Sequence, residues 1–442
     1  MSDRLTVIDL VTSSQLESHG TVSTVGVGVG VGDGCGDGTE MEEKKGAHNS
    51  SALSPSESGL PEGGHRAWLT IFGAFLVQYA SFGYINAFGV YQDFYVRDYL
   101  SNYSPSDIGW IGGVQIFLNF FLGVFTGRIF DRGHFRSLII GSILLHAIAL
   151  FSLSLSRPGS YYQVFLTNGV AFGLSCGLSY IPSLSVVGHY FERRRALAVG
   201  IVSSGSALGA VLHPIMLNKL FNSPHVGFHT GIRISAALNI LLLVIAYAVM
   251  KPNPRFSPGG PPKSSEGDET QPRNWSDRFP VLRWLREPAY AISVFASVFS
   301  FSGTFFPVFY LQLDAITHGI DPTFAFYALS IINAASIAGR TIPGALAPHV
   351  GLFNLGSAMI LAMGAVLFCM APAVSSGIGI APVVAFALLF GFFSGAAIAL
   401  TPAMFAQLAE DSSEVGAMLG VVFGVGGLFG LLGKALPTFS LP

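Results

Sequence analysis

The sequence predicts an all-α membrane protein with two helical bundles, and three observations support this. Of the 442 residues, 51% are hydrophobic and 11% are charged, whereas soluble domains carry about 25% charged residues. Apolar runs recur at a length of about 20 residues, which a helix needs to cross a bilayer. A stretch rich in proline, serine and charge, residues 251–287, separates these runs into two groups. We therefore expect most of the chain to lie in lipid, and the net charge of -2 gives no sign of nucleic-acid binding.

Residues 1–64 form a polar segment with alternating valine and glycine, which we expect to be a disordered cytoplasmic tail. Its glycines do not make a phosphate-binding loop, because no helix follows and no lysine stands at the required place. The three cysteines are far apart in the sequence, so they indicate neither a disulfide framework nor a metal site. No cofactor is expected.

The two groups of apolar segments predict a bundle at 65–250, a cytoplasmic linker at 251–287 and a second bundle at 288–442. The first group has six expected spans, at about 67–95, 107–127, 137–156, 161–187, 196–218 and 230–250. The second has five, at about 288–311, 323–344, 353–371, 380–402 and 415–435. The 23 lysines and arginines fall mainly in the tail, at 128–136, at 193–195 and in the linker. Because cytoplasmic loops are enriched in these residues, the N-terminus is expected inside.

A charged turn at 127–136 separates the second and third expected spans. Gly127 and Gly133 permit a sharp turn, and Arg128 and Arg132 mark the cytoplasmic side. Asp131 can pair with a nearby arginine or face the positive N-terminus of a neighbouring helix. The turn resembles the signature loop of major facilitator superfamily transporters, although an ordinary positive-inside loop would look similar.

The block at 189–209 is more specific. Tyr190-Phe191, Arg193-Arg194, Leu197-Ala198 and Gly205-Ser206 together resemble the junction of spans 4 and 5 in the monocarboxylate-porter branch of that superfamily, most closely its fungal members. His65-Arg66-Ala67-Trp68, Asn333 with Gly339-Arg340 and Pro343-Gly344, and Gly391-Phe392-Phe393-Ser394-Gly395 agree with the same branch. The resemblance implies a major facilitator fold with a central cavity, which works by alternating access.

The chain departs from the pattern of that branch in three ways. Pro348 occupies the position of an acidic residue in the second signature loop, so the inner contact there is expected to be weaker. Animal relatives carry a lysine and an aspartate where this chain has Asn86 and Ser336, which argues against simple lactate–proton symport. The chain also ends after the eleventh expected span, so the resemblance implies that a twelfth span is missing, through either a shortened product or an error in the gene model.

Candidate substrate-binding residues are polar groups inside the expected spans. Arg340 is the clearest, because a cation within a membrane is costly and usually lies in a cavity or the protein interior; a structural role on helix-end carbonyls is its alternative. His213 precedes Pro214 and suits proton coupling, or else is a hydrogen-bonded packing residue. Asn86 and Gln115 can bind oxygen atoms of a substrate or join helices. Tyr310 and Phe305 are candidates for an aromatic wall. For gating we expect Gly127, Arg128, Asp131, Arg132, Gly133, Arg193 and Arg194.

The sequence thus predicts a secondary transporter of small organic molecules, anionic or amphipathic, with protons as the candidate coupling ion. Uptake of a carboxylate and export of a fungal secondary metabolite both remain open. A non-transporting membrane sensor on the same fold is the alternative. A membrane-embedded enzyme is not expected, because no His-Asp-Glu group or Ser-His pair occurs at membrane depth. The expected location is the plasma membrane, with a vacuolar or other internal membrane as the alternative.

Overall fold

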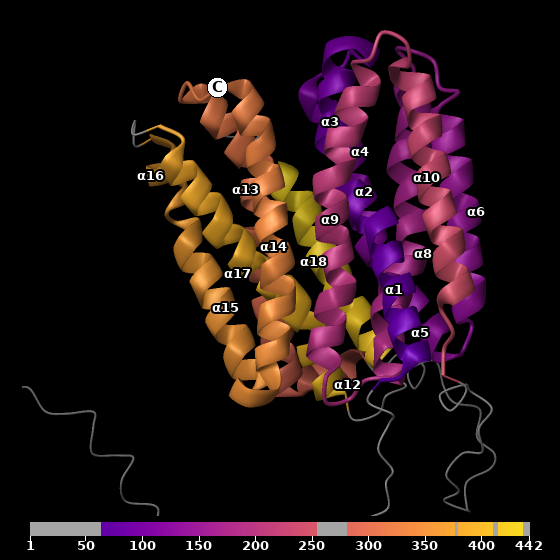
Figure 1. Ribbon diagram of the computed structural model, residues 1–442, viewed down its shortest axis with the longest axis vertical. Coiled ribbons are helices and arrows are strands. Elements are labelled where there is room, and N and C mark those ends of the chain that lie inside the picture. Colours follow the sequence, from indigo (N-terminus) through magenta and orange to yellow (C-terminus); the bar gives the residue numbers. More distant parts are fainter. Residues whose placement is uncertain (1–62, 254–280, 376–378, 410–413, 436–442) are drawn as a thin grey trace, which may run out of the picture. The chain divides into compact units, whose positions relative to one another are not determined.

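The computed structural model describes residues 63–253, 281–375, 379–409 and 414–435, and within these ranges the secondary structure is entirely helical (Figure 1). The predicted tail and most of the predicted linker lie outside the described residues. The all-α fold class is therefore confirmed for the part of the chain that the structure describes.

Helices occupy all six segments expected in the first group. They are α1 (His65–Ala80), α2 (Phe82–Ile85), α3 (Phe88–Phe94) and η1 (Tyr95–Tyr99) in the first span; α4 (Pro105–Phe121) and α5 (Gly123–Asp131) in the second; α6 (Phe135–Leu153) in the third; α7 (Tyr161–Val164), η2 (Phe165–Ala171), α8 (Phe172–Ser185) and η3 (Val186–His189) in the fourth; α9 (Arg195–Phe221) in the fifth; and α10 (Gly227–Val249) in the sixth.

The five segments of the second group are helical as well. They are α13 (Pro288–Thr317), α14 (Pro322–Val350), α15 (Leu352–Leu367), α17 (Ala381–Leu408) and α18 (Val415–Ala435), with two short helices, α12 (Val281–Arg286) and α16 (Met370–Ser375). Helix α12 lies inside the segment 251–287 that was predicted to be the linker. Among the described residues, nine helices are long and apolar enough to cross a membrane, and α15 and Val415–Leu428 are shorter apolar helices.

The first span is broken near its middle. Helix α1 ends at Ala80 and α3 begins at Phe88. In between, the Ser81 hydroxyl donates to the Val77 carbonyl at 2.6 Å, and the Asn86 amide donates to the Phe82 carbonyl at 2.7 Å. These side chains compete for backbone acceptors that a continuous helix would use. Discontinuous spans in transporters commonly lie where a substrate site is built.

Helices of the two groups pack directly on each other. Helix α14 packs against α9, and α18 packs against α5 and α4 (Figure 1). Both contacts have glycine at the interface. In lipid the hydrophobic effect does not drive helices together, so they associate mainly through van der Waals packing, and small residues let their backbones approach closely. These two contacts position the site described next.

Candidate functional site

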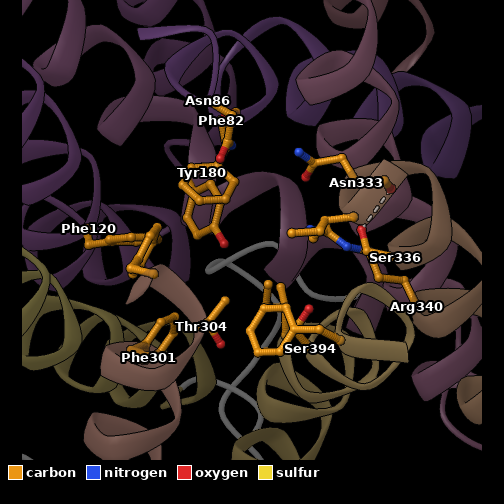
Figure 2. Close-up of a pocket in the computed structure, with 14 residues that line it drawn as sticks. Phe82, Asn86, Phe120, Tyr180, Phe301, Thr304, Asn333, Ser336, Arg340 and Ser394 are labelled. Carbon is orange, nitrogen blue, oxygen red and sulfur yellow. Dashed lines mark hydrogen bonds between the residues drawn. The ribbon is translucent and has the colours of Figure 1, made fainter. Parts of the chain in front are cut away.

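A small central pocket is lined by residues of both groups (Figure 2). Its cavity volume is about 40 Å³, which is too small for an organic substrate, so the pocket is contracted in this state. The lining residues come from α2, the C-cap of α2, α4, α8, α13, α14 and α17: Phe82, Asn86, Phe120, Tyr180, Phe301, Thr304, Phe305, Ile332, Asn333, Ser336, Arg340, Phe390, Ser394 and Ile398.

One side of the pocket is an aromatic wall. The ring of Phe82 lies 5.4 Å from that of Phe120 and 5.5 Å from that of Tyr180, measured between centroids. Phe120 in turn lies 5.8 Å from Phe301, a residue of the second group. Tilted and edge-to-face arrangements at these separations are the favoured ones for aromatic rings. The wall therefore joins the two groups and offers flat apolar surface to a bound molecule.

The other side carries the single arginine of α14. Arg340 is only 4% exposed. Its Nη1 donates to the backbone carbonyl of Ser203 and, at 2.6 Å, to the hydroxyl of Ser206, both on α9. Its Nε is buried without a hydrogen-bond partner. Among the described residues no carboxylate lies within ion-pair distance of it, so a buried guanidinium is balanced here only by neutral oxygens.

Polar groups of α14 and α17 complete this side. The Ser336 hydroxyl, one turn before Arg340, donates to the Asn333 carbonyl at 3.0 Å. Asn333 donates its amide to the Leu329 carbonyl at 2.9 Å, which leaves its side-chain oxygen available as an acceptor. Ser394 on α17 bonds the Gly391 carbonyl at 3.3 Å. In Figure 2, Asn333, Ser336 and Arg340 lie together across the pocket from the aromatic wall.

The structure separates the sequence-predicted binding residues into two sets. Arg340, Asn86 and Phe305 line the pocket. Gln115 does not: it is buried between helices and donates to the Asn168 carbonyl at 3.1 Å. His213 also lies elsewhere, with Nε2 3.3 Å from the Tyr79 carbonyl and its ring between those of Tyr79 and Tyr84. The side chain of Tyr310 lies outside the described residues.

Several lining residues were not singled out from the sequence as binding residues. Tyr180 and Thr304 lie in apolar runs without a local signal. Asn333 and Ser394 belong to stretches that resembled the family, and their place in those motifs was the available signal. Within the residues that the structure describes, no group of three or more His, Cys, Asp and Glu side chains is placed to hold a metal ion.

The first half of the predicted charged turn is helical, because α5 continues to Asp131 and only 132–134 connect it to α6. Gly127 therefore lies inside α5, at the α5–α18 contact. A Cβ added to Gly127 would lie 2.1 Å from the Gly416 carbonyl oxygen, so only glycine permits this approach. A Cβ added to Gly416 would lie 2.7 Å from Asp131 Oδ1, which places the Asp131 carboxylate at the first turn of α18. A carboxylate in this position is stabilised by the positive N-terminal end of a helix, as in the second arrangement predicted for Asp131. Gly133 has a φ of 82°, which explains the need for glycine there.

The other predicted gating residues frame these elements. Arg128 lies in the last turn of α5 and Arg132 is its C-cap. Arg194 is the N-cap of α9. Arg193 lines a second cavity, of about 590 Å³, between the loop before α9 and the adjoining ends of α14, α15 and α17. Pro348, which replaces the family's acidic residue, lines the same cavity. A role for these residues in gating stays a prediction.

The α9–α14 contact is as close as the α5–α18 contact. A Cβ on Gly200 would lie 2.1 Å from the Arg340 carbonyl oxygen, and one on Gly344 would lie 2.8 Å from that of Ala196. Arg340 therefore meets α9 with both its backbone and its side chain. The pocket arginine is part of the seam between the two groups.

Comparison with known proteins identifies similar chains. The family model described as Major Facilitator Superfamily matches residues 67–433. The aspyridones efflux protein of Emericella nidulans is 37% identical over 384 residues, covering 87% of this chain and 73% of that protein. The agnestins efflux protein of Paecilomyces divaricatus is 37% identical over 388 residues, covering 88% and 84%. The crystal structure of the human organic anion transporter MFSD10 superposes with a TM-score of 0.61 at 16% identity, covering 84% of this chain and 92% of that one, which shows a shared fold.

Proposed function

We propose, from the premise that this chain belongs to the major facilitator superfamily, that it exports a small amphipathic organic anion from the cytoplasm. That it is a multi-pass membrane transporter, and not an enzyme, follows from the family and its fungal relatives. The charge of the substrate, the direction of transport and the coupling are the proposal.

Arg340 is the observation that carries the substrate class. An isolated cation at membrane depth is expensive unless a partner offsets its desolvation. Here the guanidinium retains an unpartnered Nε beside the pocket, and no described carboxylate is close enough to neutralise it. An entering anion would supply that partner through charge-assisted hydrogen bonds. The aromatic wall opposite Arg340 suits an apolar, preferably aromatic, body on the same molecule.

Export is supported by the relatives. Two proteins at 37% identity are efflux proteins by name, one for aspyridones and one for agnestins. We place this chain in the monocarboxylate-porter branch because of its 189–209 block. Its Asn86 and Ser336 stand in place of the lysine and aspartate of animal relatives, so we do not expect simple lactate–proton symport. We take the proton gradient as its energy source and the plasma membrane as its location.

The test uses one ring system with three charges. Proteoliposomes containing the protein are loaded with 2-naphthoate, 2-naphthamide or 2-naphthylmethylammonium, and efflux is followed with and without a pH gradient. We expect 2-naphthoate to move at least about tenfold faster than the amide and the cation, since each 1.4 kcal/mol of interaction is worth tenfold. Transport of all three at equal rates would overturn the anionic substrate, and an unchanged rate without the pH gradient would overturn proton coupling.

Variants of Arg340 test whether this residue causes the preference for the anion. Arg340→Gln should abolish 2-naphthoate transport, and Arg340→Lys should impair it, because lysine lacks the planar fork of donors. Size-exclusion profiles and thermal melting of each purified variant check that it is folded. A folded glutamine variant that carries 2-naphthoate at the normal rate would show that Arg340 is structural.

A further inference from the structure

The hydroxyl of Ser206 lies in an unusual position relative to the pocket. It accepts a hydrogen bond from Arg340 Nη1 at 2.6 Å, yet Ser206 is not among the residues that line the pocket. It is 2% exposed and its own proton is donated to the Ser203 carbonyl at 2.9 Å. Ser206 therefore presents its oxygen lone pairs to the guanidinium from a different helix, and from the other group of spans.

Hydrogen bonding at Arg340 is asymmetric. A guanidinium has five N–H donors in one plane. The structure gives Nη1 two acceptors, the Ser203 carbonyl and the Ser206 hydroxyl, and leaves Nε without any. An anion that chelates the outer end of the fork needs Nη1 and Nη2 together. That end-on geometry is blocked while Nη1 is held by α9, so an anion can bind only at the side-on edge formed by Nε and Nη2.

We infer that Ser206 competes with the substrate anion for Arg340, and that this competition makes anion affinity depend on the contact between α9 and α14. When the two helices touch, as here, Ser206 occupies Nη1, only the Nε–Nη2 edge is left for the anion, and the site binds it less tightly. When they part, all five donors become available and the site binds it tightly. The inference rests on the proposed function, because it concerns the same anion at the same arginine.

The location of the contact gives the competition a direction. The first turns of α9 and the last turns of α14 adjoin the arginines that mark the cytoplasmic face. Separation of these helices opens the pocket to the cytoplasm and frees Arg340 to bind. Closure returns Arg340 to Ser206, lowers the affinity and releases the anion on the other side. Such a cycle favours export, since a ligand shifts a conformational equilibrium only through its different affinity for the two states.

Ser203 offers a matched control. Arg340 donates to the backbone carbonyl of Ser203 but to the side-chain hydroxyl of Ser206, so an alanine substitution removes the acceptor only at Ser206. Efflux of 2-naphthoate from proteoliposomes is measured over a range of concentrations for wild type, Ser206→Ala, Ser206→Thr and Ser203→Ala. Removing the competitor in Ser206→Ala should lower KM about three- to tenfold and lower kcat as well, because release becomes slow. Ser206→Thr keeps the hydroxyl and should restore both constants, and Ser203→Ala should leave both near the wild-type values.

The outcomes separate the two proposals. A folded Ser206→Ala protein with unchanged KM, or with a raised KM, would overturn the competition while leaving anion export intact. An effect of Ser203→Ala equal to that of Ser206→Ala would also overturn it, since loosened packing would then explain both. Normal efflux of 2-naphthoate in Arg340→Gln would instead show that Arg340 is structural, and equal transport of the three naphthyl compounds would overturn the proposed function itself.

Discussion

The two contacts between the halves of the chain are alike in backbone geometry and different in chemistry. At α5–α18 the backbones meet at Gly127 and Gly416, and at α9–α14 they meet at Gly200 and Arg340. In both contacts a Cβ added to the first residue would lie 2.1 Å from the carbonyl oxygen of the second. The first contact holds Asp131 at the first turn of α18, away from the pocket lining. The second holds the pocket's own arginine. One contact thus lies apart from the pocket, whereas the competition proposed above would make the other change when an anion binds.

The two contacts also end differently. Beyond Gly344, α14 reaches Pro348, where the acidic residue of the family pattern is absent, and a cavity of about 590 Å³ lies there. At the end of α5 the Asp131 carboxylate fills the corresponding position against α18. A contact closed by a carboxylate at a helix N-terminus gains electrostatic stabilisation. The α9–α14 contact lacks this electrostatic stabilisation, so we expect α9 and α14 to separate more easily than α5 and α18.

Alanine at the contact glycines should have the largest effect. Gly127→Ala and Gly200→Ala each place a Cβ about 2 Å from a backbone oxygen, and overpacking of this kind costs about 1–3 kcal/mol. We expect transport in proteoliposomes to fall at least about tenfold in both variants. Gly364→Ala, with no atom within 4 Å of the new Cβ, is the control and should transport normally. Normal rates in both contact variants would mean that these helices do not close in the transport cycle.

Asp131→Asn should have a smaller effect, on one contact alone. The substitution keeps the shape and removes the charge facing the first turn of α18, and a charge at a helix N-terminus is worth about 0.3–2 kcal/mol. We expect exchange between the two open states to slow about tenfold, measured by single-molecule fluorescence between labels on α5 and α18, with KM unchanged. Asp93→Asn, which removes an exposed pair with Arg97, is the control because exposed pairs contribute little. An unaltered exchange rate in Asp131→Asn would make the loop a topological signal only.

Ala347→Val tests the cavity beside the end of the α9–α14 contact. Ala347 is buried in a small hydrophobic cluster and also lines the 590 Å³ cavity, one turn beyond the closely packed Gly344, so the cavity has room for the two added methyl groups. Transport should change less than about twofold, because volume added to a void costs little packing energy. A loss as large as that of Gly200→Ala would show that the cavity closes during the cycle.

Reporter tags in loops should have the smallest effect on transport. They show on which side of the membrane each tagged segment lies, and so which side the two contacts face. Tags inserted in 251–287 should be cytoplasmic and tags in 313–321 external, as the distribution of lysine and arginine predicts. Protease protection in sealed vesicles of known orientation measures this. If both tags lie on the same side, the predicted arrangement of the two halves is wrong.

The sequence by itself determined the elements and several of their end points. Apolar length located helices at all eleven expected segments, because the cost of exposing backbone to lipid is a local property of each segment. Turn chemistry located the turn at 132–134, where Gly133 has its positive φ, whereas Gly127, also expected in the turn, lies inside α5. The cost of an intramembrane cation singled out Arg340, which does line the pocket. These inferences depend on a residue and its neighbours in the chain.

Only the tertiary structure decided which side chains meet. Spans that are apolar on every face carry no periodic signal for the face that points to a cavity, so Gln115 and His213 were as plausible from sequence as Asn86, yet only Asn86 lines the pocket. The partnership of Arg340 with Ser206 links residues 134 positions apart, and no local pattern encodes it. The close approach of α9 and α14 depends on Gly200 and Gly344, where an added Cβ would meet the backbone of the other helix. That requirement for glycine arises only when both helices are packed together.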